Sequence, residues 1–161
     1  MSALQNKIDF VALVSVTMAN SNGDPLNGNR PRTNYDSRGE ISDVCIKRKI
    51  RNRLQDMGQC IFVQSDDRCD DGCASLRDRA EQAIKGVKDR NEYARLACEK
   101  WIDVRSFGQV FAFKEKKKGD GVSVGVRGPV SMHQALSVSP VEIESLQITK
   151  SVNGETPSKK E

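Results

Sequence analysis

The stretch from Asn20 to Arg53, NSNGDPLNGNRPRTNYDSRGEISDVCIKRKIRNR, decides how the rest of the chain is interpreted. Its first half is predicted to be a loop, because glycine, asparagine and proline recur too often for regular structure and leave backbone N–H groups available to a ligand. Its second half predicts a helix, capped by Ser42 or Asp43, with five cations among residues 47–53. A polar loop leading into the N-terminus of a basic helix favours the binding of a chain of phosphate groups. The stretch therefore predicts a nucleic-acid site.

The predicted helix spans Ser42 to Met57 and carries an apolar stripe at helical spacing, made of Ile46, Ile50, Leu54 and Met57. The cations fall on both sides of this stripe. One flank carries Lys47, Arg48 and Arg51, and the other carries Lys49 and Arg53. Gly58 is placed to end the helix.

Composition restricts the possible functions without selecting one. The 26 basic and 22 acidic residues leave a net charge of +4, so the clustering of charge matters more than its sum. Aromatic residues make up 5% of the chain, which argues against extensive base stacking. No apolar run is long enough to cross a membrane, and Phe10 to Val16 lacks the flanks of a signal peptide. Five cysteines without an export signal indicate a cytoplasmic protein with reduced thiols.

The remaining pattern predicts an α+β fold with a sheet backed by helices. Ile8 to Met18 is apolar and β-branched, as in a central strand. A helical pattern runs from Ser75 to about Lys100, and Gly86 or Asn91 is expected to divide it. Ile61 to Val63, Trp101 to Phe113, Val122 to Met132 and Val141 to Thr149 are the other expected strands. Gly125, Gly128 and Pro129 suggest a bulge or bend, and Lys114 to Gly121 a charged loop.

Neither a metal site nor a catalytic site stands out. Cys69-x3-Cys73, with Cys60 nearby and His133 distant, lacks the paired short spacing of zinc sites, so free thiols are expected. His133 has no evident partner for acid–base chemistry. An aspartate near a phosphodiester can assist cleavage, which makes Asp24 and Asp36 the acids to consider, although both also suit a turn.

Four segments together resemble one family. They are the strand and loop from Ile8 to Pro25, G-N-x-P-R from Gly28 to Arg32, S-D-V-C-x-K-R-K-I-R from Ser42 to Arg51, and the pair WIDVRSFGQVFAF and VRGPVSMHQALSVSP. This order is similar to that of the CRISPR-associated Cas7 family, in particular the Csd-type (Csd2) backbone subunit of type I-C Cascade.

The resemblance implies an RRM-like (ferredoxin-like) palm over residues 1–152, with an insertion at about 64–121 and a disordered tail at 153–161. It implies a non-catalytic crRNA-binding subunit without a cofactor, which polymerises along the guide and meets target DNA through it. Other copies of the chain and Cas5- and Cas8-type subunits would be its partners.

The RNA-contact positions implied by the resemblance lie in three groups. They are Asn20, Asn22, Gly23, Arg30 and Arg32 in the loop, Lys47, Arg48 and Arg51 in the helix, and Arg105, Ser106, Phe107, Gly108, Gln109 and Arg127 in the last pair of segments. Cations and backbone donors grip phosphates without reading sequence, which suits a scaffold that accepts any guide.

The chain departs from the family in length, since family members continue beyond the segment matching Ile148 to Val152. The expectation is therefore a palm that is incomplete at its C-terminus, with an unpaired edge. Two other functions stay open: a metal-assisted endoribonuclease that uses Asp24, as in related effector complexes, and a non-functional truncated remnant.

Overall fold

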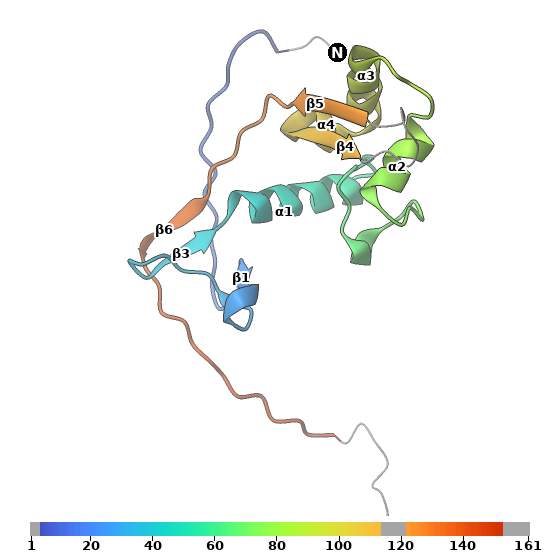
Figure 1. Cartoon of the computed structure of the whole chain (residues 1–161). Coiled ribbons are helices and arrows are strands. Elements are labelled where there is room, and N and C mark those ends of the chain that lie inside the picture. Colours follow the sequence, from blue (N-terminus) through green and yellow to red (C-terminus); the bar gives the residue numbers. More distant parts are fainter. Residues whose placement is uncertain (1–3, 114–121, 153–161) are drawn as a thin grey trace, which may run out of the picture. The chain divides into compact units, whose positions relative to one another are not determined.

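A computed structural model describes residues 4–113 and 122–152 of the chain (Figure 1). The chain forms two compact units. The first unit comprises Met1–Glu40 and Ser137–Glu161, and the second unit comprises Ile41–Leu136.

The second unit contains the predicted basic helix as α1, Asp43–Asp56. The Ser42 hydroxyl accepts the N–H of Cys45 at 3.3 Å and caps the start of the helix. At its end Gly58 adopts a left-handed conformation with φ 75°. The Gly58 N–H donates to the Gln55 carbonyl at 2.9 Å, and the Gln59 N–H donates to the Leu54 carbonyl at 3.0 Å. These two bonds form a Schellman motif, so the predicted helix and its glycine stop are both confirmed.

The long helical pattern after residue 75 forms two helices, α2 at Leu76–Ala83 and α3 at Arg90–Lys100. Gly86, with φ 78°, lies in the break between them, as one of the two alternatives predicted. Asp89 accepts the N–H of Glu92 at 2.7 Å and caps α3. A short helix, α4 at Ile102–Phe107, and a 3-10 turn, η2 at Asp66–Arg68, complete the helices described in this unit.

Strands β4, Gly108–Phe113, and β5, Val122–Arg127, pair in antiparallel register from Gly108 opposite Arg127 to Phe113 opposite Val122. Helices α3 and α4 pack against this pair (Figure 1). The core of the unit comprises Phe62, Ala80, Ile84, Tyr93, Ala97, Trp101, Val104, Phe111 and Val124. Phe62 lies at its centre, with its ring centroid 4.7 Å from that of Trp101 and 5.0 Å from that of Phe111. Aromatic contacts of this kind fix the packing of helices on the strand pair.

The first unit consists of short elements. β1, Gly23–Asp24, pairs antiparallel with β2, Arg30–Pro31, around a 3-10 turn, η1, at Pro25–Asn27. β3, Arg38–Ile41, pairs with β6, Ala135–Pro140. Among the described residues, every buried hydrophobic side chain lies within Ile41–Leu136, so the first unit depends on hydrogen bonds and ion pairs.

The α+β class is therefore confirmed. The strands described form three separate two-stranded sheets, and these elements are compatible with an RRM-like palm.

The predicted strand at Ile8–Met18 is wrong for the described structure. These residues form no strand, and their apolar side chains are exposed, with Leu13 at 92% and Val11 at 88%. A β-branched pattern shows only that a segment suits a strand, and a strand exists only where another segment pairs with it. No described segment pairs with residues 8–18.

Three further strand predictions are corrected. Ile61–Val63 is irregular, because its backbone N–H groups bond to the Asp103 carboxylate instead of a neighbouring strand. Residues 102–107 are helical despite their strand-like composition, since burial of Asp103 and Val104 overrides local propensity. Val141–Thr149 forms no strand, and the strand precedes it at Ala135–Pro140.

The expected irregularity lies at Gly128 and not at Gly125. Gly125 pairs regularly with Val110, whereas β5 ends at Arg127. A Cβ atom on Gly128 would lie 2.2 Å from the Ser106 carbonyl oxygen, so glycine is required where the two backbones approach.

Two predictions, the charged loop at Lys114–Gly121 and the tail at 153–161, lie outside the described residues. The proposed palm boundaries and the insertion at 64–121 stay predictions. Within residues 4–113 and 122–152, no helix is both long and apolar enough to cross a membrane.

Candidate nucleic-acid interface

The three helix cations predicted to contact RNA are all engaged within the protein. The Arg51 Nε lies 3.0 Å from the Asp103 Oδ2, and its guanidinium carbon lies 5.2 Å from the centre of the Phe107 ring. The Arg48 Nη1 donates to the Val63 carbonyl at 2.7 Å. The Lys47 Nζ lies 3.1 Å from the Asp43 Oδ2, one turn earlier in α1. This flank of α1 therefore holds the helix in place as well as carrying positive charge.

Asp103 is the centre of this arrangement and was not predicted. Its carboxylate is fully buried and accepts the N–H of Phe62 at 2.8 Å and of Val63 at 3.0 Å, in addition to Arg51. A buried carboxylate is stable only with such partners. The one signal in the sequence was an aspartate inside the apolar run WIDVRSF.

Burial lowers the pKa of Arg48, and the neighbouring charge of Arg51 lowers it further. A guanidinium stays protonated at neutral pH despite such a shift. Both arginines therefore add to the positive potential of the helix while bonded to protein groups.

The opposite flank of α1 is open to solvent. Lys49 and Arg53 are both exposed. The side chains of the apolar stripe are only half-buried at Ile46, Ile50 and Leu54, and Met57 is 62% exposed. The predicted stripe exists, but it packs less closely than the pattern suggested.

The last group of predicted contacts lies together, at the junction of α4, β4 and β5. Gly108 is opposite Arg127 in the strand register, and the Ser106 carbonyl accepts the Val130 N–H at 2.9 Å. The Gln109 Nε2 donates to the Val110 carbonyl at 3.0 Å. Arg105 and Arg127 are exposed, whereas Phe107 is half-buried against Arg51. The structure thus brings this junction and α1 together within the second unit.

The amides of the first-unit loop close the loop on itself. The Asn20 Nδ2 donates to the Asn29 carbonyl at 2.7 Å, and the Asn22 carbonyl accepts the Arg32 N–H at 2.9 Å. Gly23 packs tightly, since a Cβ atom there would lie 1.9 Å from the Asn29 Oδ1. The loop is consequently ordered by its own polar groups.

The two loop arginines differ in how firmly they are held. The Arg30 Nη2 donates to the Ser145 hydroxyl at 2.5 Å, but its side chain stays exposed. The Arg32 Nε is 3.8 Å from the Glu40 Oε1, and 42% of its side chain is exposed. Because such an exposed pair is weak, Arg32 remains accessible to an anion.

The two acidic residues considered for catalysis, Asp24 and Asp36, both lie at turns. The Asp24 Oδ1 accepts the Leu26 N–H at 3.1 Å and caps η1, which confirms its expected role in a turn. In the turn that contains Asp36, the Asn34 Oδ1 accepts the N–H groups of Asp36 and Arg38. Asn34 therefore has the turn-forming role that was expected of Asp36.

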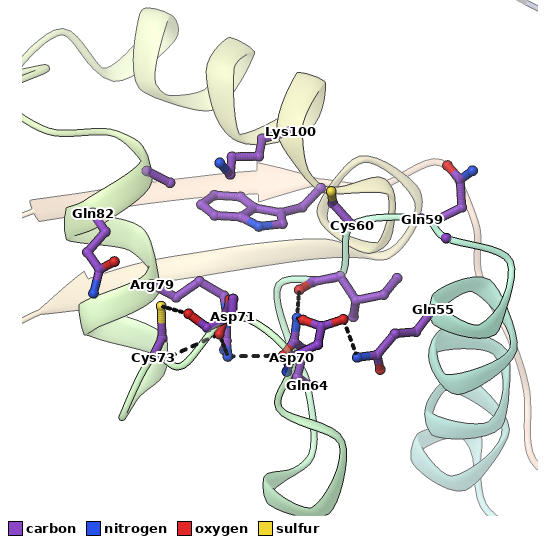
Figure 2. Close-up of a pocket in the computed structure, with 14 residues that line it drawn as sticks. Gln55, Gln59, Cys60, Gln64, Asp70, Asp71, Cys73, Arg79, Gln82 and Lys100 are labelled. Carbon is purple, nitrogen blue, oxygen red and sulfur yellow. Dashed lines mark hydrogen bonds and ion pairs between the residues drawn. The ribbon is translucent and has the colours of Figure 1, made fainter.

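A hollow of about 390 Å³ lies in the second unit between the end of α1, the loop at 58–73, α2, and Lys100 and Trp101 at the end of α3 (Figure 2). Arg79, which is 5% exposed, is one of the residues that line the hollow. Its Nε lies 2.5 Å from the Asp71 Oδ2, and its Nη1 donates to the Phe62 carbonyl at 3.0 Å. The Arg79 guanidinium holds the pKa of Asp71 well below its usual range.

Polar side chains that line the hollow form hydrogen bonds with one another. The Gln64 Nε2 donates to the Asp70 Oδ1 at 2.7 Å, and the Gln55 Nε2 donates to the Asp70 Oδ2 at 2.8 Å (Figure 2). This network fastens the loop to its helices.

The five cysteines are free thiols. Among the described residues, no group of three or more histidine, cysteine, aspartate or glutamate side chains is arranged to hold a metal ion. His133 is exposed.

These features define an α+β protein with a small, largely aromatic core, and exposed cations on α1, at the α4–β5 junction and in the first-unit loop are among its surface charges. A family model described as CRISPR-associated protein Cas7 matches residues 6–161. The chain belongs to this family. It is also similar to a CRISPR-associated protein Cas7 from Haloferax volcanii, with 26% identity over 155 residues, which cover 85% of this chain and 44% of the relative. The chain thus spans less than half the length of that relative.

Proposed function

We propose that this protein is an RNA-binding backbone subunit of a CRISPR effector complex of type I-C. The observation that carries the proposal is the Cas7 family match over residues 6–161. In this function several copies polymerise along crRNA, bind Cas5- and Cas8-type subunits, and meet target DNA through the guide. The protein acts in the cytoplasm and requires no cofactor.

We propose the same RNA contacts that the family resemblance implied. They are Asn20, Asn22, Gly23, Arg30, Arg32, Lys47, Arg48, Arg51, Arg105, Ser106, Phe107, Gly108, Gln109 and Arg127. Exposure divides these residues by role. Arg30, Arg105 and Arg127 are exposed and are proposed to bind phosphates directly, whereas Arg48 and Arg51 add positive potential while they hold α1.

The function is proposed to be non-catalytic. The Asp24 carboxylate caps η1, which supports a structural role for it. Incubating labelled RNA with the wild type and with Asp24→Ala tests this point. We expect intact RNA in both reactions, and cleavage that disappears in Asp24→Ala would establish the endoribonuclease instead.

RNA binding is tested by reversing two exposed cations of the α4–β5 junction. We expect Arg105→Glu/Arg127→Glu to weaken binding of single-stranded RNA. The salt dependence should become weaker. The magnitude of the slope of log K against log [salt] should decrease by about 1.4, since each of the two lost phosphate contacts on a single strand contributes about 0.7. The matched control is Lys85→Glu/Lys88→Glu, which changes net charge equally at exposed cations outside the proposed interface.

Equal loss of affinity in the two double variants would show that only net charge matters, and it would remove the junction from the interface. Absence of salt-dependent RNA binding by the wild type would overturn the function itself. Assignment to type I-C is tested separately, by copurification with a guide RNA and with Cas5- and Cas8-type subunits.

A further inference from the structure

Tyr35 lies at the tip of a hairpin in the first unit and is fully exposed, at 109%. The hairpin is formed by the Glu40 N–H, which donates to the Arg32 carbonyl at 2.9 Å, and by a bridge between Thr33 and Gly39. The Asn34 N–H donates to the Arg38 carbonyl at 3.0 Å. Residues 35–37 are therefore a three-residue hairpin loop.

This tip has a defined backbone. The Asn34 Oδ1 accepts the N–H groups of Asp36 at 3.0 Å and of Arg38 at 2.9 Å. The Ser37 N–H donates to the Asn34 carbonyl at 3.1 Å, and Ser37 adopts a left-handed φ of 57°. A left-handed residue at the end of a three-residue loop is a common hairpin geometry. Because the loop residues lie beyond the paired strands, the Tyr35 ring has no surface of the hairpin to pack on.

Tyr35 is also unusual among the aromatic residues of the chain. Phe62, Tyr93, Trp101 and Phe111 are buried, and Phe107 and Phe113 are half-buried. Phe10 is the other exposed aromatic residue, but it lies in an extended segment without strand pairing. Tyr35 thus combines a free ring with a backbone fixed by hydrogen bonds.

Residues 30–40 carry three arginines, Arg30, Arg32 and Arg38, and two carboxylates, Asp36 and Glu40. The Arg32 Nε lies 3.8 Å from the Glu40 Oε1. The Arg38 Nη1 donates to the Ser137 carbonyl at 2.9 Å and to the Val138 carbonyl. Both acceptors are uncharged carbonyl oxygens, so these bonds do not offset the positive charge of the guanidinium. An exposed ring beside guanidinium groups suits single-stranded nucleic acid, whose bases stack while its phosphates bind cations.

We propose that Tyr35 is a base-stacking residue that takes one unpaired nucleobase of single-stranded RNA, with the adjoining phosphates at the hairpin arginines. The inference rests on the proposed RNA-binding function and adds a contact with a base to contacts with phosphates. One ring in each copy leaves most bases free to pair, and stacking on a ring does not select a sequence.

The test measures the affinity of the full chain for two oligonucleotides of about 8 nucleotides, the scale that one small domain covers. One is oligouridine, and the other has the same sugars and phosphates without bases. We expect Tyr35→Ala to weaken binding of oligouridine by about 5- to 150-fold, the range of alanine substitutions at stacked aromatic residues. Binding of the abasic strand should not change, and Tyr35→Phe should bind both strands like the wild type.

The salt dependence gives an independent readout. Because Tyr35 carries no charge, the slope of log K against log [salt] should be the same for the wild type and for Tyr35→Ala. Trp101 fluorescence checks the fold of the second unit, and the amide exchange of residues 30–40 checks the hairpin.

Three outcomes would overturn the role of Tyr35 while leaving RNA binding intact. They are equal affinities of the wild type and Tyr35→Ala for oligouridine, an equal loss on both strands, and a change confined to self-association, which would place the ring at a contact between copies. If the wild type binds neither strand, the proposed function fails, and the stacking role fails with it.

Discussion

Asp103 shows how one buried carboxylate can connect distant parts of a chain. It lies on α4, accepts two N–H groups from the loop before η2, and pairs with Arg51 of α1. The acceptors of Asp103 are thus satisfied by groups 40 to 52 residues away in sequence. Asp103 therefore holds α1, α4 and the loop before η2 together within the second unit.

We predict that Asp103→Asn destabilises the protein by about 3–5 kcal/mol, since removing one partner of a buried pair leaves the other charge uncompensated. Urea unfolding followed by Trp101 fluorescence measures this change. The control Glu99→Gln breaks an exposed ion pair with Arg95 on α3 and should leave the urea midpoint unchanged. A midpoint shift in Asp103→Asn no larger than that of the control would contradict the role assigned to Asp103.

Asp71 should make stability depend on pH. Arg79 lowers the folded-state pKa of Asp71, whereas the unfolded-state pKa is about 3.9. The ionised pair therefore stabilises the fold fully above about pH 5, and this contribution is lost as the pH falls below the unfolded-state pKa.

We predict that Asp71→Asn lowers the free energy of unfolding at pH 7, and that the difference from the wild type shrinks between pH 5 and pH 3. Urea midpoints at several pH values measure the two curves. A difference that stays constant over this range would show that the effect of the substitution is not due to the charge of Asp71.

At the scale of elements, the β4–β5 pair depends on close contact between two backbones. A Cβ atom on Gly128 would lie 2.4 Å from the Gly108 nitrogen and 2.2 Å from the Ser106 carbonyl oxygen. Backbone atoms cannot move aside as a flexible side chain can. Gly125, in the middle of β5, has open space where its Cβ would be.

We predict that Gly128→Ala destabilises the protein by at least about 2 kcal/mol, while Gly125→Ala changes stability by no more than about 0.5 kcal/mol. Chemical denaturation of the two variants compares identical substitutions within β5 and directly after it. Equal stabilities would mean that the backbones at the α4–β4 turn separate at little cost.

The elements that were predicted correctly have strong local signals. α1 has a capping serine, an apolar period and a glycine with a left-handed φ, all within residues 42–58. Gly86 divides α2 from α3 for the same local reason. In contrast, residues 8–18 and 102–107 have strand-like composition, but pairing and burial elsewhere in the chain decide their conformation.

At the scale of the whole molecule, the two units differ in what stabilises them. The buried hydrophobic side chains of the described residues lie within Ile41–Leu136, whereas the first unit has polar loops and short strand pairs. Apolar burial is the main term that opposes the loss of chain entropy on folding. The first unit should therefore open more easily.

We predict that, in the full chain, backbone amides of α1, α3, β4 and β5 exchange with solvent far more slowly than those of residues 4–20 and 141–152. Hydrogen exchange followed by mass spectrometry measures the difference, and the hairpin at 32–40 should show intermediate protection. Uniform protection of both units would show that the first unit gains stability that its own contacts do not explain.

The sequence by itself determined the α+β class, the basic helix and its ends, and the Cas7 resemblance, because these depend on local periodicity, capping residues and ordered motifs. Only the tertiary structure decided which cations are free. Arg48 and Arg51 are bonded to Val63 and Asp103, whereas Arg105 and Arg127 remain exposed. A helical pattern places charges on a flank, but the partners that hold them come from segments far along the chain, and local sequence does not encode that contact.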